Sequence, residues 1–171
     1  FSVLLCVLFA DGIVDVIIKP LVGRWRPSND PVIKYTIHVV NGMRLKDFSF
    51  CSAHAANTMA IAVFFSLLIR CRLMSVTLVS WSLLNGWTRL YLGVHYPSDV
   101  LCGFAIGAAL GFLVYLFYYK VYYKISPKIK YISNQYTCTG YAHEDLDFVM
   151  GIIMLTFVYA MLRGCVLTAG V

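Results

Sequence analysis

Charged residues are scarce in this chain. Asp, Glu, Lys and Arg together make up 13% of its 171 residues, about half the share found in an average protein. Hydrophobic residues make up 60%, well above the roughly 45–50% of soluble globular domains. The core of a small soluble domain cannot absorb that excess, whereas a lipid bilayer can. The composition therefore excludes an ordinary water-soluble domain and favours a membrane protein.

Motifs for metal and nucleic-acid binding are missing as well. None of the six cysteines forms a C-x-x-C pair, so a zinc site is not expected. The sequence contains no zinc finger, no aromatic RNA-binding motif and no long basic helix. Its net charge of +6 comes from Lys and Arg residues scattered between apolar segments, which favours lipid headgroups and anionic substrates over nucleic acid. We therefore expect no metal, no cofactor and no nucleic-acid partner.

Five apolar segments approach the length needed to cross a membrane as helices. They predict an all-α fold, a multi-pass transmembrane helical bundle, in which the last segment is a candidate peripheral addition. The chain starts at Phe1, inside an apolar segment and without the basic region of a signal peptide, so we expect its true N-terminus to lie further upstream. The five segments are residues 1–18, 53–69, 73–90, 97–119 and about 146–167.

Polar motifs stand at the ends of these segments. If successive segments alternate in direction, then Lys19, residues 52–54, Arg89 and residues 95–99 all fall on one side of the membrane. That arrangement gathers two histidines, several cations and a carboxylate at one face. The same side chains would be needed to hold a phosphate and attack its phosphorus.

The first histidine, His54, follows a serine at the start of an apolar segment. Ser52 is a good N-cap, and small residues fill the first turn after it. A helix N-terminus offers free N–H groups and the positive end of a dipole, which suit an anion. His54 would project beside that anion. The alternative is a serine cap followed by an ordinary histidine at the membrane interface.

The second histidine, His95, precedes Pro97, which suits the first position of a helix. Asp99 would then lie near the third helical position. It is placed to accept the N–H of one His95 ring nitrogen, which would leave the other nitrogen with a free lone pair for nucleophilic attack. The alternative is an acidic helix start beside an interfacial histidine.

Three cations complete the predicted site: Lys19, Arg26 and Arg89. Together they would neutralise a phosphate dianion and its transition state. The alternative is that each long side chain reaches toward the lipid headgroups. Asp15 lies four residues before Lys19, so we expect an ion pair that aims the lysine.

These motifs resemble the three-part signature of the type 2 phosphatidic acid phosphatase family, which shares its site with vanadium haloperoxidases and bacterial acid phosphatases. Six residues separate Lys19 from Arg26-Pro27, then comes Ser52-Ala53-His54, and finally five residues separate Arg89 from His95 and three more separate His95 from Asp99. Some positions differ from the usual family pattern. Cys51 and Ala53 replace a proline and a glycine, and Thr88 replaces a serine while keeping its hydroxyl.

The resemblance implies an architecture. Residues 1–120 would form the phosphatase core, with membrane helices and active-site loops like those of the acid phosphatase and vanadium haloperoxidase fold. Residues 121–171 would add a basic loop and an extra C-terminal membrane helix. Two further helices would precede the chain, because family members typically have six.

The resemblance also implies a chemistry that needs no metal. His95, oriented by Asp99, would attack phosphorus and form a phosphohistidine, while His54 would protonate the leaving oxygen. Asp15 and Thr88 would support the binding groups from behind. The groups implied to hold the phosphate oxygens are Lys19, Arg26, Ser52, the N–H of Ala53, and Arg89.

We therefore predict an integral membrane phosphatase that hydrolyses a lipid phosphate or diphosphate. Candidate substrates are undecaprenyl diphosphate, phosphatidylglycerol phosphate, phosphatidate and lipid A phosphates. A lipid phosphotransferase and an inactive membrane protein that binds lipid phosphates remain as alternatives. The basic residues are concentrated opposite the site, so the positive-inside rule favours a cell (inner) membrane protein whose site faces away from the cytoplasm.

Overall fold

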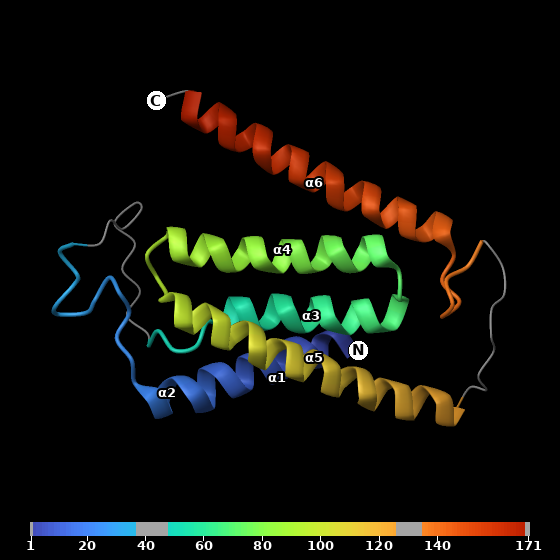
Figure 1. Ribbon diagram of the computed structural model, residues 1–171, viewed down its shortest axis with the longest axis horizontal. Helices are drawn as coiled ribbons and strands as arrows, with labels where there is room; N and C mark the ends of the chain where they lie inside the picture. The colour runs from blue at the N-terminus through green and yellow to red at the C-terminus, as the bar shows by residue number, and fades with distance from the viewer. Residues whose placement is uncertain (1, 37–47, 126–134, 170–171) are drawn as a thin grey trace.

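The computed structural model describes residues 2–36, 48–125 and 135–169, and in these the chain is almost entirely helical. Figure 1 shows elongated helices that run along one common direction, apart from the divergent last helix. The predicted all-α architecture is confirmed. The elements are α1 (Ser2–Asp11), the π-helix η1 (Gly12–Ile18), α2 (Lys19–Val22), α3 (Ala53–Ile69), α4 (Arg72–Tyr91), α5 (Pro97–Ile125) and α6 (His143–Ala169).

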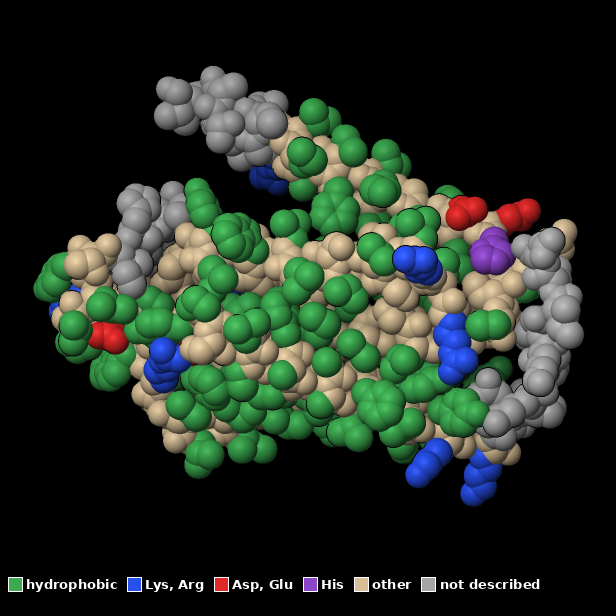
Figure 2. Space-filling view, in the orientation of Figure 1, with side chains coloured by type: hydrophobic (Ala, Val, Ile, Leu, Met, Phe, Trp, Pro, Cys, Tyr) green, Lys and Arg blue, Asp and Glu red, His purple; other side chains and the backbone are tan. Residues whose placement is uncertain are grey.

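Two of these helices are long and apolar enough to cross a membrane. They are the stretches Pro97–Tyr122 and His143–Arg163, and the helix Ala53–Ile69 is a shorter apolar one. Figure 2 shows hydrophobic side chains covering the flank of the bundle, while most of the visible charged side chains lie toward its two ends. That distribution suits a bundle embedded in lipid.

The closest packing in the bundle joins α3 and α5, and glycines make it possible. Gly107 and Gly111 lie one turn apart on α5 and face the backbone of Ala56 and Ala60 on α3. A Cβ added to Gly107 would lie 2.2 Å from the Ala56 carbonyl oxygen, and one added to Gly111 would lie 2.4 Å from that of Ala60. Small residues at such intervals let membrane helices approach closely. This contact fixes the start of α3 against the start of α5.

The helix ends come together at one end of the bundle. In Figure 1 the C-terminal end of α4, the starts of α3 and α5, and α2 all lie at the left. The sequence argument from alternating directions predicted this gathering. The predicted membrane orientation rests in part on four basic residues that lie outside the described residues: Arg44, Lys46, Lys128 and Lys130.

Helix α6 is attached to the bundle mainly near its own start. Leu146 and Met150 are buried in a cluster with Ile69, Met74 and Leu78, at the junction of α3 and α4. Beyond that cluster α6 diverges from α4, and its C-terminal end returns toward the end of the bundle that holds the helix starts (Figure 1).

Candidate active site

A cavity of about 480 Å³ opens among the gathered helix ends. Its walls come from the first helical stretch, the start of α3, the end of α4 and the loop before α5. The cavity brings together side chains that are up to 84 positions apart in the sequence (95 − 11). Its lining residues are Asp11, Asp15, Lys19, Arg26, Ala53, His54, Asn57, Thr58, Arg89, Val94 and His95.

His95 is held in the short connection between α4 and α5. Gly93 has a positive φ of 66°, a backbone conformation that glycine adopts readily. The chain thereby turns back after α4 and carries His95 over the cavity. The side chain is almost completely buried, with 6% of the residue exposed, so its ring is fixed by its neighbours.

Two neighbours assign the tautomer of the His95 ring. Nδ1 lies 2.8 Å from the backbone carbonyl oxygen of Ser49, which can only accept a hydrogen bond, so Nδ1 carries the proton. Nε2 lies 3.5 Å from Nη1 of Arg26, and a guanidinium can only donate. Both contacts therefore leave the lone pair on Nε2, where a nucleophile at phosphorus would need it.

Asp99 lies beside His95, as the sequence suggested, but at a longer distance than a direct hydrogen bond. Its Oδ2 lies 3.8 Å from His95 Nδ1, beyond hydrogen-bond distance, because the carboxylate is already engaged elsewhere. It accepts hydrogen bonds from the Ser49 hydroxyl and from the backbone N–H of Tyr96 at 3.0 Å. Asp99 therefore holds Ser49, and the Ser49 carbonyl in turn orients the imidazole.

Arg24 neutralises this buried carboxylate, a role that sequence reasoning missed. Its Nη1 donates to Asp99 Oδ1 at 2.9 Å and to the Ser98 hydroxyl at 2.8 Å. Its guanidinium also stacks 3.8 Å from the centre of the Tyr96 ring. Since Asp99 is fully buried, an opposite charge at this distance removes much of the cost of burying it.

The loop after Arg26 contacts the segment that follows His95. The Tyr96 hydroxyl donates to Asp30 at 3.0 Å. The backbone N–H of Val32, followed by the Tyr96 hydroxyl, holds the pKa of the Asp30 carboxyl below its usual range. The pKa of Tyr96 is raised, first by burial and then by this contact with Asp30. These contacts connect the arginine-bearing loop to the segment that carries His95.

The second motif forms the start of α3 as expected, but its serine is not in the cavity wall. Ser52 is fully buried, and its side chain caps the helix by accepting from the Ala55 N–H at 3.5 Å. Its own N–H donates to the carbonyl of Asp99 at 3.1 Å. Ala53 and His54 line the cavity instead. Ser52 therefore shapes the helix start whose next two residues line the cavity.

The three predicted cations all reach the cavity. The expected pair of Asp15 and Lys19 is confirmed, with 2.6 Å between Oδ1 and Nζ. Arg26 is 4% exposed, and its Nη1 donates to the carbonyl of Val94 at 3.3 Å. Arg89 lies on the last turn of α4. The walls thus carry three positive charges together with the carboxylates of Asp11 and Asp15.

Thr88 supports its neighbour weakly. Its hydroxyl donates to the carbonyl of Asn85 at 2.7 Å and accepts from Nε of Arg89 at 3.4 Å. The first bond anchors the threonine on its own helix, and the second limits the movement of the arginine head. This agrees with the supporting position expected for Thr88.

The deeper part of the cavity is more polar than the sequence suggested. The Asn57 amide donates to Asp11 Oδ1 at 2.6 Å and joins α3 to α1. At the next residue, the hydroxyls of Thr58 and Ser82 lie 2.9 Å apart between α3 and α4. These contacts join positions 46 and 24 apart in the chain, so no local pattern in the sequence indicates them.

Cys51, which takes the place of the usual proline, is an inert part of this site. It is fully buried, and burial raises the pKa of its thiol to about 11. At neutral pH the group is therefore a protonated, hydrophobic filler. In the described part of the chain, no three His, Cys, Asp or Glu side chains are grouped to hold a metal ion.

Comparison with known proteins gives a consistent result. A family model described as the PAP2 superfamily matches residues 1–123. The lipid A 4'-phosphatase of Bacteroides thetaiotaomicron is 43% identical over 112 residues, which is 65% of this chain and 50% of that protein. The undecaprenyl-diphosphatase BcrC of Bacillus subtilis is 33% identical over 101 residues, 59% of this chain and 51% of that protein.

One solved structure is similar as well. It is the crystal structure of a transmembrane PAP2-type phosphatidylglycerolphosphate phosphatase from Bacillus subtilis, with a TM-score of 0.56 and 26% sequence identity. The similarity covers 74% of this chain and 60% of that one. The chain spans about half the length of the curated relatives that it matches.

Proposed function

This chain belongs to the PAP2 superfamily, and on that premise we propose that it is the catalytic part of an integral membrane phosphatase acting on a lipid phosphate. The observation that supports this most strongly is the cavity of about 480 Å³. It joins two imidazoles and three cations from four separate segments of the chain. Such a convergence suits a phosphate dianion and the charge that develops as it is transferred.

The proposed reaction has two steps. Nε2 of His95 attacks phosphorus, a P–N bond forms, and the bond from phosphorus to the lipid oxygen breaks. His54 gives its proton to that leaving oxygen. Water then attacks the phosphorus of the phosphohistidine and gives one proton back to His54, the P–N bond breaks, and inorganic phosphate leaves. Lys19, Arg26 and Arg89 hold the equatorial oxygens throughout, and the N–H of Ala53 adds a donor at the helix start.

Asp99 acts through its neighbours in this scheme. It fixes Ser49, whose carbonyl keeps the proton on Nδ1 of His95. It also caps the segment that carries the nucleophile. Ser52 builds the start of α3, and its hydroxyl stays a predicted phosphate ligand.

Among the candidate substrates, a lipid A phosphate is favoured. The relative with 43% identity carries the name lipid A 4'-phosphatase. Other relatives act on a prenyl diphosphate or on phosphatidylglycerol phosphate by their names, so the reaction class is shared while the lipid differs. We further propose a multi-pass arrangement in the inner membrane, with the active site facing away from the cytoplasm, a core over residues 1–120 and an added unit over residues 121–171.

An activity panel with the full-length protein tests this function. Purified protein in detergent should release phosphate from at least one of four lipids: lipid A, undecaprenyl diphosphate, phosphatidylglycerol phosphate and phosphatidate. Vanadate should block release, because it mimics the transferred phosphoryl group, while a chelator should leave it unchanged. Protein that binds these lipids but releases no phosphate from any of them would contradict the proposal and favour an inactive binding protein. Transfer to an added alcohol, with little free phosphate, would favour the phosphotransferase.

A further inference from the structure

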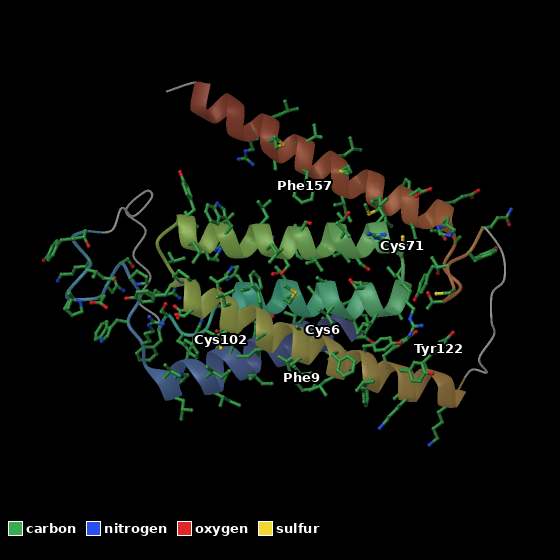
Figure 3. The ribbon with its side chains drawn as sticks, viewed as in Figure 1. Cys6, Phe9, Cys71, Cys102, Tyr122 and Phe157 are labelled. Atoms are coloured by element: carbon green, nitrogen blue, oxygen red, sulfur yellow. The ribbon has the colours of Figure 1, made fainter. Side chains whose placement is uncertain are left out.

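A second hollow, of about 720 Å³, lies between α6 and the paired helices α3 and α4. Figure 2 shows the space between α6 and the body of the bundle, and Figure 3 shows Phe157 extending from α6 toward α4. Large apolar side chains dominate its walls, and among the described lining residues the one that is charged is Asp145, on the first turn of α6. Phe65 and Trp81 line it from α3 and α4, and Ile153 and Phe157 line it from α6.

This groove continues the catalytic cavity along the same face of α3. His54 and Thr58 line the cavity, and Ile61 and Phe65 line the groove. Successive residues of this set are four, three and four positions apart, which keeps them on one face of a helix with about 3.6 residues per turn. The wall of the phosphate site and the wall of the groove therefore lie on the same face of α3, with Thr58 and Ile61 as their nearest residues.

Helix α4 has the same continuity. Arg89 lines the cavity, and Trp81 and Leu78 line the groove. At about 100° per residue, these three side chains fall within roughly 80° of one another around the helix. Both helices thus present a single face that is polar at the catalytic end and apolar beyond it.

The change from polar to apolar occurs at a defined level. The hydrogen bond between Thr58 and Ser82, 2.9 Å long, is the last interhelical polar contact on this face before the apolar residues begin. From His54 to Ile69, the face extends for about 22 Å, since 15 residues each rise about 1.5 Å. That is longer than one leaflet, which is half of the roughly 30 Å hydrocarbon core.

We propose that this groove holds a hydrocarbon chain of the lipid whose phosphate occupies the catalytic cavity, so that α6 forms one wall of the substrate site. The inference rests on the proposed function, since it needs a lipid substrate. The order of the surfaces, cationic, then hydroxylated, then apolar, matches the order of groups in a lipid phosphate. The groove also widens toward the catalytic end, because α6 diverges from α4 in that direction (Figure 1), which gives a chain an entrance from the bilayer.

Filling the groove tests the proposal. Ala160 lines the groove on α6, so Ala160→Trp should occupy space that the chain needs. The matched control is Leu155→Trp on the same helix: Leu155 is 71% exposed and is not among the groove residues. Each variant is made in the full-length protein and assayed with dihexanoyl and dipalmitoyl phosphatidate in one detergent.

We expect Ala160→Trp to raise KM for the dipalmitoyl lipid by about tenfold while kcat changes less than about twofold, the pattern of lost ground-state binding. KM for the dihexanoyl lipid and both constants of Leu155→Trp should stay within about twofold of wild type. Equal effects of the two variants, or equal effects on both lipids, would overturn the proposal. A change in oligomeric state with Ala160→Trp but no dependence on chain length would assign the groove to a second copy and overturn it as well.

A labelling experiment separates this inference from the proposed function, because it needs no turnover. Phosphatidate with a photoreactive group near the end of one acyl chain is added to the full-length protein and irradiated. Cross-links should map to the groove residues of α6, survive in Leu155→Trp and disappear in Ala160→Trp. Cross-links elsewhere would refute the chain-binding groove even if the enzyme is active. Cross-links in the groove without phosphate release would leave the groove standing and refute the phosphatase.

Discussion

Replacing Gly107 by alanine should disable the enzyme by forcing α3 and α5 apart. The added Cβ would lie 2.2 Å from the carbonyl oxygen of Ala56 and 2.9 Å from its carbonyl carbon and Cα, and real Cβ contacts are not shorter than 3.0 Å. The two helices must therefore separate locally by at least 0.8 Å (3.0 − 2.2). Backbone atoms form both sides of the contact, so no side chain can rotate out of the way.

The displacement reaches the active site because both helices begin there. Ala56 is two residues after His54, and Gly107 is on the same helix as Asp99. A misplacement of about 1 Å between reacting groups can cost about 10²-fold in rate. Overpacking of this kind also lowers the free energy of unfolding, typically by about 1–3 kcal/mol. We therefore expect kcat to fall by one to two orders of magnitude, on the order of 10–100-fold.

The assay is the initial rate of phosphate release from a lipid phosphate by purified protein, with thermal unfolding in the same detergent. Gly151→Ala is the matched control, because a Cβ there meets nothing within 4 Å. That variant should keep the wild-type rate, and alanine should stabilise its helix slightly. Wild-type rate and stability in Gly107→Ala would refute the view that this helix contact sets the geometry of the site.

Two further predictions concern charge and topology. Arg24→Gln removes the cation beside the buried Asp99. The arginine side chain is 38% exposed, so solvent weakens its electrostatic interaction with the carboxylate. We expect kcat to fall about tenfold with KM nearly unchanged. A rise in KM with kcat unchanged would show instead that Arg24 contacts the substrate. The topology test uses a variant that keeps only Cys51 and Cys138, of which Cys138 is exposed. A membrane-impermeant maleimide should modify only Cys138, and only after the cells are permeabilised. Modification of Cys138 in intact cells would reverse the proposed orientation.

Local sequence signals predicted where α3 and α5 begin. The start of α3 follows from the cap at Ser52, and the start of α5 follows from Pro97, because both residues act on the backbone next to them. The end of α5 lies beyond the expected residue 119, since neither glycine nor proline interrupts residues 120–125. Likewise the first helical stretch runs through Pro20 to Val22, because a proline near a helix N-terminus interrupts nothing.

The residues expected in the site came from motif spacing, and most of them line one cavity. The interactions that sequence reasoning missed have two causes. A hydrogen bond to a backbone atom leaves no trace in residue types, and a contact between distant positions leaves no local pattern. The carbonyl of Ser49 orients His95, and any residue at that position would offer a carbonyl. The partnership of Arg24 with Asp99 joins positions 75 apart in the sequence, so neither residue alone predicts the other.

Trapping the phosphorylated enzyme is the most direct test of His95 as the nucleophile. Full-length protein is mixed with a substrate carrying labelled phosphate, denatured within milliseconds and digested for mass spectrometry. The phosphohistidine mechanism predicts a labelled phosphate on Nε2 of His95 that is stable to alkali and lost in acid. The label should be absent from His95→Ala and retained in His54→Ala. Label on another residue, or lipid phosphate hydrolysis at the wild-type rate by His95→Ala, would contradict it.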